Sequence, residues 1–230
     1  MALPALPLLE WSRGRQAIYS FLSALFLYPD PERLSLLYQM AHAFSSGKAL
    51  WASFGFFLPL IRLVETLSRL RDGGPAQVQQ EYTRLFLLDP LAPPYESFYR
   101  DPQGPGRAWV VVQVKRAYAE AGLAASPDTG QPADFIATEL EFMASLCARE
   151  AEAWEEEREG VALDLCRRQR SFLDGHLARW ASSLAERVRE ASPHGFYALA
   201  AEAAHAFTHH DLDWLTLLLD LGGQKGGVYG

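Results

Sequence analysis

The sequence is poor in cysteine, and nothing at its start looks like a secretory signal. Its two cysteines, Cys147 and Cys166, fall in separate stretches with helical periodicity. Two such residues do not make the framework of a small disulfide-stapled protein. The N-terminus also lacks a charged segment followed by an apolar one. We therefore expect a protein of the reducing cytoplasm.

Long hydrophobic runs are missing as well. The longest near-continuous run, from Phe54 to Ile61, has eight residues and contains Pro59. A helix that crosses a membrane needs about 20 apolar residues. The sequence therefore predicts no membrane span.

Basic residues are in the minority, with 21 Lys and Arg against 28 Asp and Glu and a net charge of −7. A nucleic-acid partner requires a concentrated basic face, so this class is disfavoured, whereas an acidic surface suits a basic partner. A chain of 230 residues can bury a sizeable core without metal or disulfide staples. Its stability does not require a cofactor, and we predict none.

The usual active-site signatures are also missing. The sequence contains no GxxxxGK phosphate loop, no HExxH pair and no CxxC pair. Ser97 has no histidine in its local sequence, and no pair of nucleophile and base is visible. We predict that the protein is not an enzyme and has no catalytic residues.

One histidine-rich stretch, HAFTHHDLD from His205 to Asp213, keeps an alternative open. His210-Asp211 is a doublet typical of helical metal-dependent phosphohydrolases. The alternative function is such an enzyme, with these candidate ligands: His205, His209, His210 and Asp211, completed by His176 and Asp220. The competing interpretation is a helix end, where histidines complement the helix dipole and Asp211 caps the next helix.

Apolar residues recur at helical spacing along almost the whole chain, whereas strand-like alternation is scarce. This pattern predicts an all-α fold, a single-domain bundle of about nine helices over residues 1–221, with a flexible glycine-rich tail at 222–230. The helices are expected at these positions: a first stripe over 18–26, then 31–44, 49–71 with a break at Pro59, 78–86, 107–123, 132–159, 162–191, 196–207 and 212–221. The segment 107–123 is ambiguous, because its three consecutive valines favour a strand. We predict a helix there, since no partner strand is visible.

One loop interrupts the helical pattern with aromatic residues. The stretch LDPLAPPYESFYRD, residues 88–101, carries three prolines, and proline stiffens both itself and the residue before it. Rings on a stiff loop beside Glu96 suit a peptide-binding wall, with apolar contact from the rings and one charge for a basic side chain. The alternative is that the rings fill the core of the bundle.

Two segments resemble one known family. YTRLFLLDPLAPPYESFYRD, residues 82–101, is similar to the signature of the TorD/DmsD/NarJ family of cytoplasmic chaperones that mature molybdenum oxidoreductases. QPADFIATELEFMASL, residues 131–146, resembles the Pro-x-Asp-His motif of that family and the helix that follows it. The rest of the chain matches more weakly, in the spacing of aromatic residues and leucines. Where the family has histidine after the aspartate, this sequence has Phe135, so no role of that histidine carries over.

The resemblance implies an all-α chaperone and names its partners. It would bind the N-terminal twin-arginine signal peptide and the apo form of the catalytic subunit of a molybdopterin oxidoreductase. It would then assist cofactor insertion and delay export until maturation. A guanine nucleotide has been proposed for the family, but no phosphate motif here supports one. The sequence does not identify the client enzyme or decide between a monomer and a homodimer. A third possible function is a helical interaction domain with an unrelated partner.

By position, the resemblance maps the peptide-binding pocket onto Leu85, Phe86, Pro94, Tyr95, Glu96, Ser97, Tyr99, Asp134 and Phe135. A twin-arginine signal joins cations to an apolar segment, so its receptor needs carboxylates beside an apolar groove. Glu96 and Asp134 are assigned to the arginines; Leu85, Phe86, Tyr95 and Tyr99 are assigned to the apolar part.

Several of these residues also have a purely structural interpretation. Asp134 follows Pro132 in a first helical turn, where a carboxylate stabilises the helix dipole by about 0.3–1 kcal/mol. Leu85 and Phe86 fit the core, and we expect Glu139 and Glu141 to be solvated. Three tryptophans are expected to serve packing: Trp109, Trp180 and Trp214.

Overall fold

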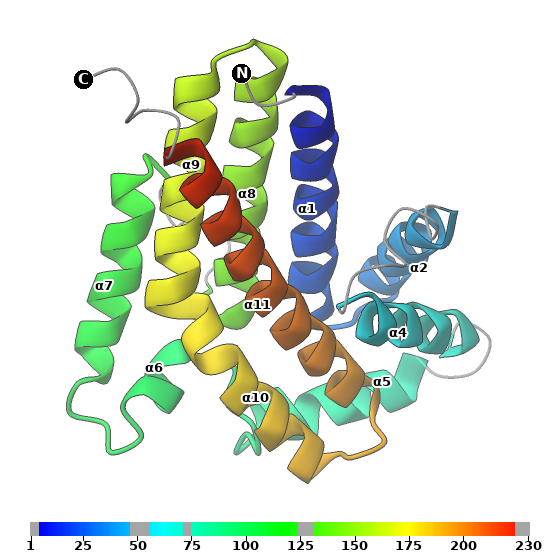
Figure 1. Cartoon of the computed structure of the whole chain (residues 1–230). Helices are drawn as coiled ribbons and strands as arrows, with labels where there is room; N and C mark the ends of the chain where they lie inside the picture. The colour runs from blue at the N-terminus through cyan, green and yellow to red at the C-terminus, as the bar shows by residue number, and fades with distance from the viewer. Residues whose placement is uncertain (1–4, 47–55, 71–74, 124–130, 224–230) are drawn as a thin grey trace.

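The structure, a computed structural model, describes residues 5–46, 56–70, 75–123 and 131–223 (Figure 1). Its described residues are helical, and strand pairing among them is limited to one isolated bridge. The elements are α1 (Ala5–Leu25), α2 (Pro31–Ser46), α4 (Phe57–Leu70), α5 (Pro75–Tyr82), η1 (Thr83–Leu87), α6 (Glu96–Arg100), α7 (Arg107–Glu120), α8 (Ile136–Glu155), α9 (Glu159–Phe172), η3 (Leu173–Leu177), α10 (Ala178–Ala191) and α11 (Phe196–Gly223). The predicted all-α fold is confirmed.

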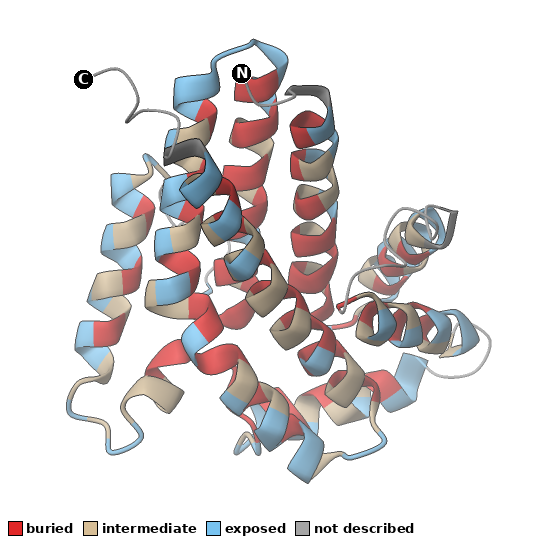
Figure 2. Ribbon diagram, viewed as in Figure 1, coloured by how far each residue is buried: buried red, intermediate tan, exposed pale blue. Residues whose placement is uncertain are grey.

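The centre of the molecule is the pair α1 and α8, which pack against each other along most of their length. Helix α9 packs on α8, and α11 crosses in front of them while contacting α10, α9 and α4 (Figure 1). Figure 2 shows that α8 is buried almost throughout, whereas α7 and α9 keep broad exposed faces. Helix α8 is therefore buried between α1 and α9 at the centre of the bundle.

The valine-rich segment is helical. Val110, Val114 and Tyr118 are the buried residues of α7, and they recur at intervals of four, which is one face of a helix. The consecutive valines do not form a strand, because the described residues offer no sheet to receive one. The preference for a helix is confirmed.

The boundary predicted near the C-terminus is wrong. The predicted break between Phe207 and Leu212 does not exist, because α11 runs without interruption from Phe196 to Gly223. Asp211 therefore caps no helix; its side chain is buried in the middle of α11. The segment 162–191 is helical as predicted, but the π-helical turn η3 separates α9 from α10.

Other expectations fall partly outside the described residues. The structure does not describe residues 49–55 of the third predicted helix or residues 224–230 of the predicted tail. The described part of the third helix is α4, which carries Pro59 in its first turn. In the part of the chain that the structure describes, no helix is both long and apolar enough to cross a membrane.

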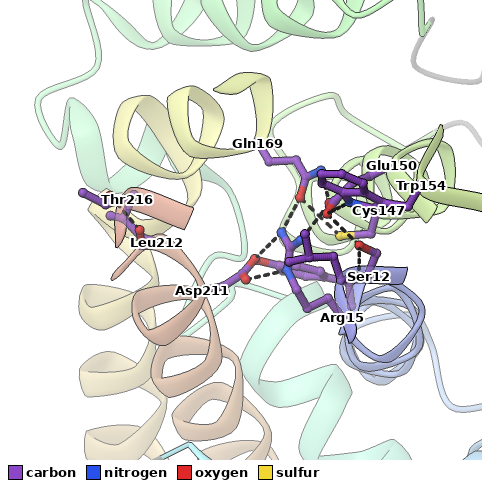
Figure 3. A network of polar contacts seen from close by, with 11 residues as sticks. Ser12, Arg15, Cys147, Glu150, Trp154, Gln169, Asp211, Leu212 and Thr216 are labelled. Carbon is purple, nitrogen blue, oxygen red and sulfur yellow. Dashed lines mark hydrogen bonds and ion pairs between the residues drawn. The ribbon is translucent and has the colours of Figure 1, made fainter. Parts of the chain in front are cut away.

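A buried polar network joins four helices, α1, α8, α9 and α11 (Figure 3). Arg15 of α1 donates from Nε to Asp211 of α11 at 2.6 Å and from Nη1 to Glu150 of α8 at 2.8 Å. Gln169 of α9 accepts from the same guanidinium group and donates to Glu150 at 2.7 Å. Tyr19 donates its hydroxyl hydrogen to Asp211 at 2.7 Å. All these side chains are fully buried, so the network fixes how α1, α8, α9 and α11 meet.

Candidate functional site

The two segments that carry the family resemblance lie against each other. The N–H of Glu96 donates to the carbonyl of Asp134 at 2.9 Å, and the N–H of Ile136 donates to the carbonyl of Pro94 at 3.0 Å. Tyr95 and Phe135 consequently form the isolated antiparallel bridge of the structure. This pairing attaches the proline-rich loop to the start of α8 and makes one site of two distant segments.

Asp134 connects the same two segments through its side chain. Its carboxylate is only 3% exposed and accepts the N–H of Ser97, in the first turn of α6, at 3.2 Å. Helix α8 begins two residues later, at Ile136. The sequence predicted that this carboxylate stabilises the dipole of the helix that follows it, α8. In the structure it also stabilises the start of α6, by accepting the N–H of Ser97.

Glu96 lies deeper than Asp134. Its side chain is fully buried and accepts a hydrogen bond from Nη1 of Arg100 at 2.6 Å. Nδ1 of His176 lies 3.0 Å and 3.2 Å from the two carboxylate oxygens. The carboxylate of Glu96 is thus engaged inside the protein, by the guanidinium group of an arginine of its own helix and by a ring nitrogen of a histidine of η3.

Glu139, which was expected to be solvated, is fully buried, so that expectation is wrong. One of its oxygens accepts the Nε1–H of Trp180 at 3.1 Å. Burial, followed by the nearby charge of Glu96, raises the pKa of Glu139 well above its usual range. Burial therefore favours the neutral form of this carboxyl group, while Glu141 on the opposite face of α8 is exposed as predicted.

The three rings of the loop have different surroundings. Tyr99 stacks on Trp180 with centroids 5.5 Å apart, and Tyr95 tilts against Phe135 at 5.8 Å. Burial and then the charge of Asp134 raise the pKa of Tyr95. Both tyrosines are partly buried against the core, so they neither project freely nor fill the interior.

The third ring, Phe98, lies between two cations. The guanidinium groups of Arg107 and Arg187 each lie 5.0 Å from its centroid. Arg187 also donates from Nε to the carbonyl of Leu91 at 2.6 Å, which holds the loop against α10. Arg107 likewise donates from Nε to the carbonyl of Asp101 at 3.2 Å.

A pocket of 620 Å³ opens beside these rings, which is within the range of about 300–1,000 Å³ typical of ligand sites. It is lined by Asp89, Pro90, Pro93, Tyr95, Ser97, Phe98, Arg107, Pro132, Asp134 and Arg187. Of the predicted site residues, Tyr95, Ser97 and Asp134 line this pocket. The other six belong to the layer below or beside it: Leu85, Phe86, Pro94, Glu96, Tyr99 and Phe135.

Leu85 and Phe86 lie in the hydrophobic core. Leu85 is fully buried, and the ring of Phe86 packs against three other rings of the core, those of Phe26, Tyr82 and Tyr197. The exposed apolar side chains of this region come next in the chain. Leu87, Leu88 and Leu91 are 51%, 77% and 44% exposed, on either side of the pocket residues Asp89 and Pro90.

Sequence reasoning missed Arg107, Arg187 and Asp89 as site residues. Arg107 begins α7 shortly after the loop, and Arg187 lies near the end of α10, far from the loop in the chain. No sequence pattern pointed to either arginine as a site residue. Asp89 has a left-handed φ of 47°. Its position between Leu88 and Pro90 was the one available signal.

The histidine-rich stretch does not assemble the predicted metal ligands. Asp211 faces Arg15 and Tyr19 in the buried network, and Nδ1 of His209 lies 3.2 Å from the carbonyl of His205. His176 contacts Glu96 instead. Within the described residues, no group of three or more His, Cys, Asp or Glu side chains is arranged to hold a metal ion. The ligand set on which the phosphohydrolase alternative depends is therefore not formed.

Comparison with known proteins identifies the family. The model of the nitrate reductase delta subunit family matches residues 55–186. A protein of Vibrio cholerae serotype O1 (strain ATCC 39541) named Chaperone protein TorD is 30% identical over 211 residues, which cover 89% of this chain and 93% of the relative. A protein of the same name from Aeromonas salmonicida is 30% identical over 158 residues, 68% of this chain and 70% of the relative.

A solved structure shares the fold. The crystal structure described as a redox enzyme maturation protein from Archaeoglobus fulgidus superposes with a TM-score of 0.54 at 23% identity, over 84% of this chain and 93% of that one. This likeness shows that the chain shares the all-α fold of that protein. The chain belongs to the nitrate reductase delta subunit family, and its curated relatives are named as TorD chaperones rather than as enzymes.

Proposed function

We propose that this chaperone works in the cytoplasm, where it binds the twin-arginine signal peptide and the apo form of the catalytic subunit of a molybdopterin oxidoreductase. Binding assists cofactor insertion and delays export until the subunit is mature. Family membership supports the general task. The observation that carries the peptide site is the 620 Å³ pocket, where Asp134 and Tyr95 of the two motif segments meet.

The pocket suits a peptide with a cationic and an apolar part. Asp134 and the exposed Asp89 supply carboxylates in its wall, and charge-assisted hydrogen bonds from arginine are the strong ones in recognition. Pro90, Pro93 and Tyr95 supply a rigid apolar surface, which costs little entropy on binding. The exposed Leu88 and Leu91 extend this surface toward the apolar part of the signal.

The pocket also contains two positively charged side chains, which contact the protein itself. Arg107 and Arg187 lie over Phe98 and bond to backbone carbonyls, so both are engaged in holding the loop. Glu96 is assigned a positioning role, because a direct contact with a peptide arginine would require Arg100 to leave it. Asp134 is the carboxylate that we assign to the twin arginines.

The test is titration calorimetry with the signal peptide of a molybdoenzyme encoded beside the gene. Asp134→Asn keeps an oxygen that accepts the N–H of Ser97 but removes the charge. We expect this variant to weaken binding about tenfold or more, the effect of losing a charged hydrogen bond of roughly 1.5–3 kcal/mol. Tyr95→Ala is expected to weaken binding through lost apolar contact.

The matched control is Asp164→Asn, which removes one exposed carboxylate from the outer face of α9. It should leave the affinity unchanged, and a peptide with both arginines replaced by alanine should bind the native protein poorly. Equal affinity of the native protein and Asp134→Asn would refute the assignment of this pocket. Absence of binding to any such peptide would refute the peptide-binding function itself.

A further inference from the structure

A second pocket, of 500 Å³, is lined mainly by residues of α7, α9 and η3. Its wall carries four arginines from four different helices: Arg100 of α6, Arg116 of α7, Arg168 of α9 and Arg179 of α10. None of these residues lines the pocket beside the proline-rich loop. We call this second pocket the arginine pocket.

The arginine pocket is rich in positive charge, although the net charge of the protein is −7. One carboxylate lines it, Glu120, and this residue pairs with Arg116 at 2.7 Å. Beneath the wall, Glu96 pairs with Arg100 at 2.6 Å. Among the described residues, Arg168 and Arg179 form no ion pair, so their positive charge is uncompensated.

Backbone carbonyls hold three of the four guanidinium groups in place. Arg100 donates from Nη1 to Gly175 at 2.8 Å, Arg168 from Nη1 to Glu120 at 2.6 Å, and Arg179 from Nε to Asp174 at 2.5 Å. A guanidinium group has five N–H donors, so each keeps further donors for an anion. Groups fixed in this way lose little freedom when a ligand binds.

The π-helical turn η3 builds part of this arrangement. The carbonyls of Asp174 and Gly175, which orient Arg179 and Arg100, both belong to η3. Such turns are rare and are found frequently at functional sites. His176 of η3 and Phe172 just before it stack with centroids 5.1 Å apart, and both line the pocket.

We propose that the arginine pocket binds a compact small-molecule polyanion of the phosphate class. Its volume is in the range of small-molecule sites, and planar guanidinium groups match the oxygens of a phosphate in pairs. The site is separate from the peptide pocket and does not depend on the function proposed for it.

The experiment measures pyrophosphate binding to the full chain by calorimetry and thermal shift, at constant ionic strength maintained with chloride. We expect saturable binding and a rise in Tm, with weaker effects of monophosphate. Arg168→Gln and Arg179→Gln should each weaken pyrophosphate binding about tenfold, as expected when a charged hydrogen-bond donor is lost.

Arg167→Gln is the matched control, because Arg167 neighbours Arg168 on α9 but pairs with Asp164 outside the pocket. It should leave pyrophosphate affinity unchanged. Since Arg168 and Arg179 are exposed, their variants are expected to fold, which circular dichroism verifies. No saturable binding of pyrophosphate, or an equal loss in Arg167→Gln and Arg168→Gln, would overturn the proposal.

Discussion

Glu139 and Glu141 are two residues apart on α8, yet one is fully buried and the other exposed. The interior position of Glu139 places its carboxyl group beside Trp180 and the charge of Glu96. A carboxylate in such surroundings loses its hydration, so the neutral form is favoured. The protein therefore buries Glu139, with a raised pKa, next to Glu96, whose carboxylate is paired with Arg100.

This arrangement predicts how stability depends on pH. The pKa of Glu139 is raised in the folded state, so its favourable contribution is complete below the pKa of the unfolded chain. It is lost as the pH rises toward the folded pKa, because the unfolded state releases its proton first. Glu139→Gln removes this loss and keeps an acceptor for Trp180.

We therefore expect Glu139→Gln to be more stable than the native protein at pH 8, with a smaller difference at pH 5, in urea denaturation. Glu141→Gln, the exposed neighbour, should show no such trend. A difference that is independent of pH, or one that grows as the pH falls, would contradict a raised pKa at Glu139.

For single residues, the sequence predicted which residue types lie at the site, but it did not predict the environment of each side chain. It singled out Tyr95, Ser97 and Asp134, which do line the pocket. It assigned Glu139 to solvent because acidic residues are rarely buried, and the partner Trp180 is supplied by a helix much later in the chain. Contacts between residues so far apart in the chain cannot be predicted from the local spacing of residues.

Among the elements, α11 is the one whose sequence was misinterpreted. Its polar stretch around His209 and Asp211 resembles a helix end, and the break predicted there is wrong. The polar residue Asp211 is instead satisfied by Arg15 and Tyr19 of α1, so the helix continues. A polar residue within a helix marks a boundary only when no other element satisfies it.

The network around Arg15 makes a strong prediction about the packing of these helices. Arg15→Met would leave Glu150 and Asp211 buried without their cation, which typically costs about 3–5 kcal/mol. Urea denaturation should show a loss of this size. Arg13→Met is the control two residues away, because Arg13 is exposed and its ion pairs contribute at most about 1 kcal/mol. Similar stabilities of the two variants would show that the network does not hold α1 in place.

For the whole molecule, the all-α class could be predicted because helical periodicity recurs along nearly the entire chain. The assembly of the sites could not, because each joins distant segments. The loop meets the start of α8 through the bridge between Tyr95 and Phe135, and the arginines of the arginine pocket come from four helices. The sequence contained the residues of both sites, but only the fold brings them together.

The acidic surface and the two pockets suggest a division of tasks. A cationic peptide is attracted to a protein of net charge −7, and we propose that its arginines contact Asp134 and Asp89, which line the pocket. The arginine pocket, on a different part of the surface, suits an anion instead. One chaperone could in this way hold a client signal and a small ligand at once.

We propose that the signal peptide binds in the pocket beside the proline-rich loop, and photo-crosslinking reports such a contact without relying on affinity. A twin-arginine signal peptide with a photoreactive phenylalanine in its apolar part is irradiated with the native protein, and the crosslinked residues are mapped by mass spectrometry. We predict crosslinks on the loop, at Leu88, Leu91 or Tyr95, that decrease in Asp134→Asn. Crosslinks concentrated on other elements, such as α4 or the arginine pocket, would contradict the claim.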